Sequence, residues 1–323
     1  MKEKLLNIFT EAKDEYVSGE YLSRLLGISR TAIWKRIRKL EEDGYVFESV
    51  PRLGYRLLER PERIQLPLIE QQLQTKTFGK PIQYFPVLES TQTAAHEAQL
   101  SGAPEGLALI AEEQLSGRGR RGRSFFSPPG KGIYMSFLLR PDLPLRDAAQ
   151  MTLLVSVALC RAVRRVSGAD ATIKWPNDVL INGKKMSGIL VDTVAEAANV
   201  KAMIVGIGVS VNMDGGDFPE ELRGKATSIK CEIGESVSRE TLIAAFFNQF
   251  EALYEMYFRD GFAPIRFLWE ALSSTLQQEA VVTTAKGELR GIAVGITGEG
   301  ALLLRDASGT VHSIYSGDLA VPF

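Results

Sequence analysis

A glycine-arginine run near the middle of the chain, Gly117–Arg123, most constrains what this part of the sequence can fold into. It holds four arginines and three glycines in seven residues and no acid, and Pro128-Pro129-Gly130 follows it. Adjacent prolines and a glycine rule out a helix there, so we expect a loop. Glycines let the backbone approach a ligand, and guanidinium groups match phosphate and carboxylate oxygens. The pattern therefore predicts a loop that holds a polyanion.

The spacing Gly117-x-Gly119-x-x-Gly122 also matches the fingerprint of dinucleotide-binding folds. That fingerprint requires a strand before it and a helix that begins at its last glycine. Residues 107–112 could form the strand, but residues 124–130 cannot begin a helix. We therefore exclude a dinucleotide site and expect side chains and loop amides, without a helix N-terminus, to contact the anion.

Composition limits the chemistry that the chain can carry out. With 323 residues and a net charge of −1, it is long enough for two or three domains and is not polybasic as a whole. Its two histidines, His96 and His312, make a histidine triad or a multi-histidine metal site hard to build. We expect no metal site formed by the protein alone, and the absence of a G-x-x-x-x-G-K-[ST] motif excludes a P-loop.

Cysteine usage and hydropathy favour a cytoplasmic protein. Cys160 and Cys231 lie far apart and form no C-x-x-C pair, so we expect neither a disulfide framework nor a thiolate zinc site. The N-terminus lacks the apolar core of a signal peptide, and the longest apolar stretch, around Met151–Cys160, is too short to span a bilayer. We therefore expect no membrane partner.

Residues 1–62 are predicted to form a winged helix-turn-helix domain. Ser18 can cap a second helix, and Gly27-Ile28-Ser29 makes a tight turn before a third helix that runs to about residue 43. Residues 45–58, broken near Pro51, predict the hairpin that forms the wing. The third helix buries one apolar face, made of Ile33, Ile37 and Leu40.

The third helix and the wing also carry a basic surface. Cations occupy the other helix faces, and no acid occurs in the helix before Glu41. A solvated basic helix in a protein-binding unit is the alternative, but phosphates attract such a face and a helix fits the major groove of DNA. The residues expected to contact DNA are Arg30, Thr31, Lys35, Arg36, Arg38 and, at the tip of the wing, Arg52.

Residues 68–270 are predicted to form an α+β domain with a mainly antiparallel sheet. Asn182-Gly183, between strand-like stretches at 173–181 and 185–194, is a strong hairpin signal. Hairpin-linked strands beside amphipathic helices favour this architecture over a doubly wound sheet. In residues 275–323, short strands separated by glycine turns predict a small SH3-like β-barrel, which makes the chain a multidomain α+β protein.

The motif Lys174-Trp175-Pro176-Asn177-Asp178 interrupts one of these strands. Proline removes a ladder hydrogen bond, which points to an edge or to a bulge that can aim Trp175 and Asn177 into a cleft; taken alone, however, the motif favours a bent strand with a core tryptophan. Lys185 lies just across the hairpin and suggests a charged group near a ligand. Glycines within the strand at 205–212 allow a ligand to approach closely.

Taken together and in this order, these segments resemble the biotin protein ligases. The resemblance covers essentially the whole chain, and the winged helix-turn-helix makes it similar to the bifunctional type, which also represses the biotin operon. The motifs that carry the resemblance are Ser90-Thr91, Gln114, Gly117–Gly122, Lys174–Asp178, Lys185–Ile189 and Gly208–Met213.

The resemblance implies a reaction and its partners. Biotin attacks the α-phosphate of ATP, which carries Mg²⁺, and biotinyl-5′-AMP forms. A lysine of a biotin carboxyl carrier protein, such as the acetyl-CoA carboxylase subunit, then attacks the mixed anhydride. This chemistry needs no enzyme nucleophile, because charge neutralisation and positioning accelerate it. Bifunctional members dimerise on palindromic operators, with the adenylate promoting the dimer, so a homodimer and operator DNA are implied as well.

The resemblance also implies residue roles. Lys185 and Arg120 are the implied catalytic residues. The implied biotin contacts are Ser90, Thr91, Gln92, Gln114, Arg118, Gly119, Arg120 and Lys185. The implied ATP and adenylate contacts are Arg118, Arg121, Phe125, Asn177 and Asn212. Gln92 departs from the family, which commonly has asparagine there, so its amide reaches one methylene further.

Two alternatives remain open at this point. A lipoate-type ligase uses a similar scaffold, but its longer, apolar acid accounts less well for the Gly-Arg run. A ligand-sensing repressor without ligase activity belongs to a different class, and the presence of Arg118, Arg120 and Lys185 favours retained activity over it.

Overall fold

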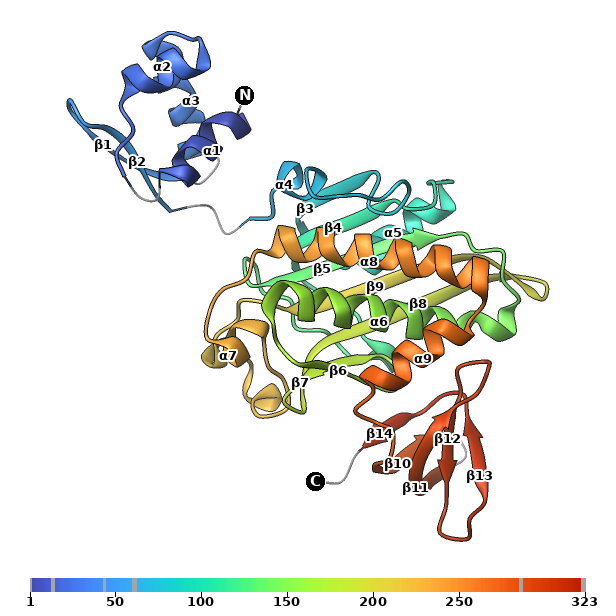
Figure 1. Cartoon of the computed structure of the whole chain (residues 1–323). Helices are drawn as coiled ribbons and strands as arrows, with labels where there is room; N and C mark the ends of the chain where they lie inside the picture. The colour runs from blue at the N-terminus through green and yellow to red at the C-terminus, as the bar shows by residue number, and fades with distance from the viewer. Residues whose placement is uncertain (1, 13–14, 43–44, 60–62, 285–286, 321–323) are drawn as a thin grey trace. The chain divides into compact units, whose positions relative to one another are not determined.

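The computed structural model describes residues 2–12, 15–42, 45–59, 63–284 and 287–320, and the chain divides into two compact units, Met1–Arg63 and Ile64–Phe323 (Figure 1). In the first unit, three helices precede a two-stranded antiparallel hairpin. These elements are α1 (Lys2–Glu11), α2 (Gly19–Leu26), α3 (Arg30–Glu42), β1 (Val46–Val50) and β2 (Gly54–Glu59).

Side-chain caps and one apolar core fix this first unit. Ser18 Oγ accepts from Tyr21 N at 3.1 Å, and Ser29 Oγ accepts from Ala32 N at 3.2 Å, so both serines satisfy amides that a helix start leaves free. Gly27 ends α2 with φ 65°, a conformation that glycine adopts without strain. The buried core includes Leu5, Leu22, Ile33, Ile37 and Leu57. The predicted winged helix-turn-helix is confirmed.

The second unit is built on a seven-stranded sheet in the order β3-β4-β5-β9-β8-β7-β6. The β3–β4 pair is parallel and the other pairs are antiparallel, as the predicted mainly antiparallel sheet requires. The strands are β3 (Ile82–Leu88), β4 (Ala108–Gln114), β5 (Gly132–Leu139), β6 (Ala171–Lys174), β7 (Asp178–Ile181), β8 (Lys184–Glu196) and β9 (Asn199–Ser210).

Helices cover both faces of this sheet. In Figure 1, α6, α8 and α9 lie over one face, while α5 packs on the other against β4, β5 and β9. Strand β4 illustrates the alternation, because Ala108 and Ile110 join the large core under α6 and α8, whereas Leu109 joins the smaller core under α5. The helices are α4 (Leu66–Glu70), α5 (Thr91–Leu100), α6 (Ala148–Ser167), α7 (Ile229–Ile233), α8 (Arg239–Asp260) and α9 (Ala263–Leu272).

The C-terminal residues form a second sheet, five-stranded and antiparallel, in the order β13-β12-β11-β10-β14. Its apolar side chains, among them Val282 and Leu302, belong to the same core as α6 and α8. Closure of this sheet into a barrel stays a prediction. The strands are β10 (Glu279–Thr284), β11 (Gly287–Ile296), β12 (Leu302–Arg305), β13 (Val311–Ile314) and β14 (Asp318–Ala320).

The expectation of one strand over residues 173–181 was wrong. Residues 173–181 form the separate strands β6 and β7, joined by a turn at Trp175–Asn177, so Pro176 lies in a hairpin turn and not in a bulge. A turn residue needs no ladder partner, which removes the conflict between proline and a sheet. The neighbouring hairpin at Asn182-Gly183 is as predicted, and both residues have positive φ, 49° and 75°.

No helix among the described residues is long and apolar enough to cross a membrane.

Candidate active site

A pocket opens on the α5 face of the seven-stranded sheet, under the Gly-Arg loop. Its floor comes from β5, β8 and β9, one wall from the start of α5, and the opposite wall from the β6–β7 turn and β14. The polar and charged side chains that line it are Ser90, Thr91, Gln92, Gln114, Arg118, Arg120, Arg123, Ser124, Ser136, Lys174, Asn177, Asp178, Lys185 and Asp318. The structure thus brings together segments that lie far apart in the sequence.

A chain of neutral polar side chains lines the α5 end of the pocket. Ser90 caps α5 and is buried. Thr91 Oγ1 lies 2.9 Å from Ser136 Oγ and 3.1 Å from Gln114 Oε1, and its backbone N donates to the same oxygen at 2.9 Å. Gln114 Nε2 in turn donates to Ser127 Oγ at 2.9 Å. Such groups can bind a neutral polar ring without adding charge.

Gln92 is part of this wall and is fully engaged in it. Its Oε1 accepts from Ser136 Oγ at 3.0 Å, and its Nε2 donates to Asp192 Oδ2 at 2.9 Å and to Ile204 O at 3.0 Å. The side chain lies flat over Gly206, where an added Cβ would approach Gln92 Oε1 to 2.5 Å. The amide of Gln92 is therefore bound to residues of β5, β8 and β9.

The Gly-Arg loop folds back on itself above the pocket. Gly119 N donates to Arg123 O at 2.7 Å, Phe125 N donates to Gly117 O at 2.8 Å, and a short 3-10 turn forms at Arg120–Gly122. Three of its four arginines, Arg118, Arg120 and Arg123, line the pocket. The loop is not a helix start, as the prolines that follow it predict.

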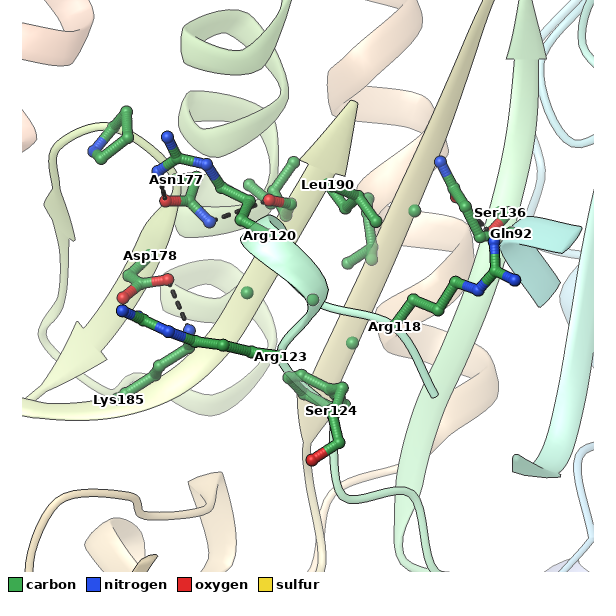
Figure 2. A pocket seen from close by; sticks show the side chains of 18 of the residues that line it. Gln92, Arg118, Arg120, Arg123, Ser124, Ser136, Asn177, Asp178, Lys185 and Leu190 are labelled. Carbon is green, nitrogen blue, oxygen red and sulfur yellow. Dashed lines mark hydrogen bonds and ion pairs between the residues drawn. The ribbon is translucent and has the colours of Figure 1, made fainter. Parts of the chain in front are cut away.

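Arg120 reaches across the pocket to the β6–β7 turn. Its Nη1 donates to Asn177 Oδ1 at 2.8 Å, and Asn177 Nδ2 donates to Ile189 O at 2.9 Å. Burial lowers the pKa of the Arg120 guanidinium from its usual value. Figure 2 shows this pair beside a second one, Lys185 and Asp178, whose Nζ and Oδ1 atoms lie 2.7 Å apart. Arg120, Arg123 and Lys185 thus lie on the side of the pocket away from Gln92, whereas the Arg118 guanidinium lies beside Gln92 and Ser136 (Figure 2).

Phe125 lies against the sheet where two strands carry glycine. A Cβ added to Gly208 would come within 2.4 Å of the Phe125 ring, and one added to Gly188 would come within 3.5 Å. Tyr134 contacts the same ring edge to face, with centroids 6.4 Å apart. The strand glycines singled out in the sequence therefore make room for an aromatic side chain of the loop.

Two of the implied nucleotide contacts lie elsewhere. Asn212 does not line the pocket, because both ends of its amide bind the backbone of Val237, at 2.9 Å each. Arg121 does not line it either, because its Nη1 turns to Asp318 Oδ2 at 3.1 Å, and Arg123 Nη2 meets the same oxygen at 2.6 Å. The structure gives no support for a ligand contact by Asn212.

Asp318 and Ser136 line the pocket but were not predicted from the sequence, because neither belongs to a recognisable motif.

The residues expected to contact DNA lie on α3 and on the hairpin of the first unit. Exposed side chains are Arg30, Thr31, Lys35, Arg38 and Arg52, while Arg36 is half-buried. Arg38 pairs with Glu41 at 3.1 Å and lies over the ring of Trp34, which is 49% exposed. Arg52 lies in the turn between β1 and β2, at the tip of the wing. This basic, solvent-facing surface can take a phosphate backbone.

Three family models match separate segments of the chain. Residues 84–212 match the biotin/lipoate A/B protein ligase family, residues 2–56 match an HTH domain, and residues 276–320 match the biotin protein ligase C-terminal domain. The chain is 41% identical to the bifunctional ligase/repressor BirA of Bacillus subtilis, over 99% of this chain and 98% of that protein. The chain belongs to the family of the bifunctional ligase/repressor BirA.

Other bifunctional and ligase members are similar as well. BirA of Escherichia coli is 31% identical over 96% of this chain and 94% of that protein, so the match again includes the N-terminal unit. The biotin–[acetyl-CoA-carboxylase] ligase of Paracoccus denitrificans is 37% identical over 67% of this chain and 92% of that protein. The structure of biotin protein ligase from Aquifex aeolicus in complex with biotin and ATP aligns with a TM-score of 0.65 at 26% identity, over 75% of this chain and 99% of that one.

Proposed function

We propose that this BirA-type chain joins biotin to ATP in the pocket described above and passes the activated biotin to a lysine of a biotin carboxyl carrier protein. A carboxylate oxygen of biotin forms a bond to the α-phosphorus and pyrophosphate leaves. The acceptor amine then attacks the acyl carbon, a C–N bond forms, and AMP and a proton depart. The observation that carries this proposal is a single pocket that combines neutral polar side chains at the start of α5 with five cationic side chains, Arg118, Arg120, Arg123, Lys174 and Lys185.

The cationic side chains of the pocket suit the difficult step, in which two anions must meet. Arg118, Arg120 and Lys185 would offset the repulsion between the carboxylate and the phosphates, and preorganised charges need no rearrangement during the reaction. Lys185 is the group we assign to the charge that develops between the carboxylate and the α-phosphate. Neither cysteine nor histidine occurs among the residues that line this pocket, which agrees with a reaction that uses no enzyme nucleophile.

Biotin and the nucleotide would occupy opposite ends of the pocket. The ring of biotin is expected at Ser90, Thr91 and Gln114, with Gln92 closing the end. The adenylate is expected near Asn177 and Phe125. Mg²⁺ would enter with ATP, since it prefers phosphate oxygens and water, and the carboxylates of Asp178 and Asp318 are already paired with cations.

The second activity we propose is repression of biotin genes by the first unit. The adenylate would promote a homodimer, and two copies of α3 would then meet two half-sites of a palindromic operator. Sedimentation of the chain with biotin and ATP should give a dimer at concentrations where the free chain is a monomer. An unchanged monomer that still binds operator would contradict this part of the proposal.

Pyrophosphate release tests the ligase activity directly. Purified chain with MgATP and biotin should release one pyrophosphate per site in a burst, and a carrier protein should convert the burst into steady turnover. A chain that binds biotin but releases no pyrophosphate would be a ligand-sensing repressor. A chain that turns over lipoate in place of biotin would be a lipoate-type ligase.

A further inference from the structure

Glu112 is a buried carboxylate in β4, two residues before the strand passes into the Gly-Arg loop. It is 5% exposed and does not line the pocket. Burying a carboxylate costs free energy unless the group is paired and hydrogen-bonded. The partners of Glu112 therefore show which segments it connects. Those partners come from four separate parts of the second unit.

The two oxygens of Glu112 bind different elements. Oε1 accepts from Gly130 N at 3.0 Å and forms an ion pair with Arg239, the first residue of α8. Oε2 accepts from Ile64 N at 2.9 Å and from Tyr84 Oη at 3.0 Å. Arg239 also donates to Gly132 O at 3.0 Å, so the ion pair holds the start of β5 as well. Bonds to a charged acceptor are stronger and more directional than neutral ones.

Through these bonds Glu112 fixes the base of the loop. The loop leaves β4 after Gln114 and returns at Gly130, where the Glu112 carboxylate binds the backbone. A second hydrogen bond joins the two sides of the loop, because Gln114 N donates to Ser127 O at 3.3 Å. The two ends of the segment that carries Arg118 and Arg120 are thus joined through the Glu112 carboxylate, which contacts neither of these two arginines and does not line the pocket.

The same carboxylate holds Ile64, the first residue of the second unit. We propose that Glu112 is a positioning residue for adenylate formation, which sets the Gly-Arg loop over the pocket and fastens that loop to the start of the second unit. The loop and the point where the chain enters this unit then share one anchor. This inference rests on the proposed ligase activity for its kinetic consequences, but not for its structural ones.

The test compares Glu112→Gln with a matched control, Glu251→Gln. Glu251, in α8, is also buried and also accepts from two backbone amides, Lys76 N at 2.7 Å and Thr77 N at 2.9 Å. Like Glu112 it does not line the pocket, but its partners lie outside the Gly-Arg loop. Both variants should lose thermal stability. Only Glu112→Gln should raise the KM for ATP, by about tenfold, because the loop arginines lose their fixed position.

A second readout does not depend on activity. Trypsin should cut the ligand-free chain within the loop about tenfold faster in Glu112→Gln than in wild type, since a loop with a loose base opens more often. The cutting rate in Glu251→Gln should match wild type. Equal cutting and equal KM in the two variants would overturn the proposal, and if wild type forms no adenylate, the proposed function fails while the trypsin comparison still tests the anchor.

Glu112→Asp covers the case in which Glu112→Gln does not fold. Aspartate keeps the charge that Arg239 needs, but its carboxylate is one methylene shorter and withdraws from Gly130 N. We expect faster loop cleavage and a raised KM for ATP with a smaller loss of stability. A folded Glu112→Asp variant with the cleavage rate and KM of wild type would overturn the proposal.

Discussion

The ammonium of Lys185 lies 2.7 Å from the Asp178 carboxylate, although in the β7–β8 hairpin Lys185 pairs with Leu180 and Asp178 pairs with Gly188. The pair forms because the hairpin turn at Asn182-Gly183 returns the chain beside itself, which places a lysine from β8 next to the end of the β6–β7 turn. Asp178 therefore holds the Lys185 ammonium in the pocket before any substrate arrives.

Lys185→Ala should slow adenylate formation by about two to three orders of magnitude, the usual effect of removing a charge that stabilises a transition state. Lys184→Ala is the matched control, because the Lys184 ammonium lies 3.8 Å from Glu232 and outside the pocket. The measurement is the rate of the pyrophosphate burst in a single turnover. Equal rates in the two variants would remove Lys185 from the mechanism.

Arg120→Gly should release biotinyl-5′-AMP about ten- to a hundredfold faster, since one charge-assisted contact is lost. Arg121→Gly should retain the intermediate nearly as wild type does, because Arg121 pairs with Asp318 and does not line the pocket. Dissociation of labelled intermediate from each variant checks the difference. If both release it at the same rate, the assignment of Arg120 is wrong.

Gly208→Ala should impair adenylation, because the new Cβ would lie 2.4 Å from the Phe125 ring and displace it. Gly216→Ala meets nothing within 4 Å and serves as the control. Fluorescence and circular dichroism should report an intact fold in both proteins. Normal activity in Gly208→Ala would mean that the place of Phe125 on the sheet does not matter for the reaction.

Lys35→Ala combined with Arg36→Ala should weaken operator binding and leave ligation unchanged. The slope of log affinity against log salt should fall by about 2, because two phosphate contacts are removed. Titration of labelled operator at several salt concentrations measures the slope. A parallel loss of ligation would show that the first unit contributes to catalysis.

The two cysteines should differ in reactivity. Burial raises the pKa of the Cys160 thiol to about 11, and its Sγ lies 3.1 Å from Ala171 O, whereas Cys231 is exposed. Since the thiolate is the reactive form, a thiol reagent at pH 8 should modify one cysteine of the native chain and both in denaturant. The Cys231→Ser variant should then show no fast reaction, and a fast reaction in it would place Cys160 in contact with solvent.

Most of the fold could be predicted from local signals in the sequence. The caps at Ser18 and Ser29 and the Asn182-Gly183 turn act within a few residues, so sequence alone was enough to predict them. Pro176 misled because a proline in an apolar run is compatible with either a bulge or a turn, and only the pairing of β6 with β7 decides between them. Helix α9 was missed although Pro264 marks its first turn, a position that proline favours, and strand β14 was missed because it is only three residues long.

The residues of the site also fall into those that the sequence could predict and those that it could not. Motif residues such as Arg120, Asn177 and Lys185 were expected together and do line one pocket. Asn212 was expected at the nucleotide because the resemblance to the family implied it, but its amide binds Val237, 25 residues away. Glu112 gave no signal at all, because its ion-pair partner Arg239 lies 127 positions along the chain and only the folded sheet brings them together.

Asp318 reaches from the C-terminal sheet to Arg121 and Arg123 and lines the pocket beside Gly317. A shortened enzyme that ends with α9 would therefore keep every motif of the Gly-Arg loop and still lose the counterion for two of its guanidinium groups. We therefore expect the smallest active fragment to include the last sheet, because without Asp318 the charges of Arg121 and Arg123 would stand uncompensated beside the pocket.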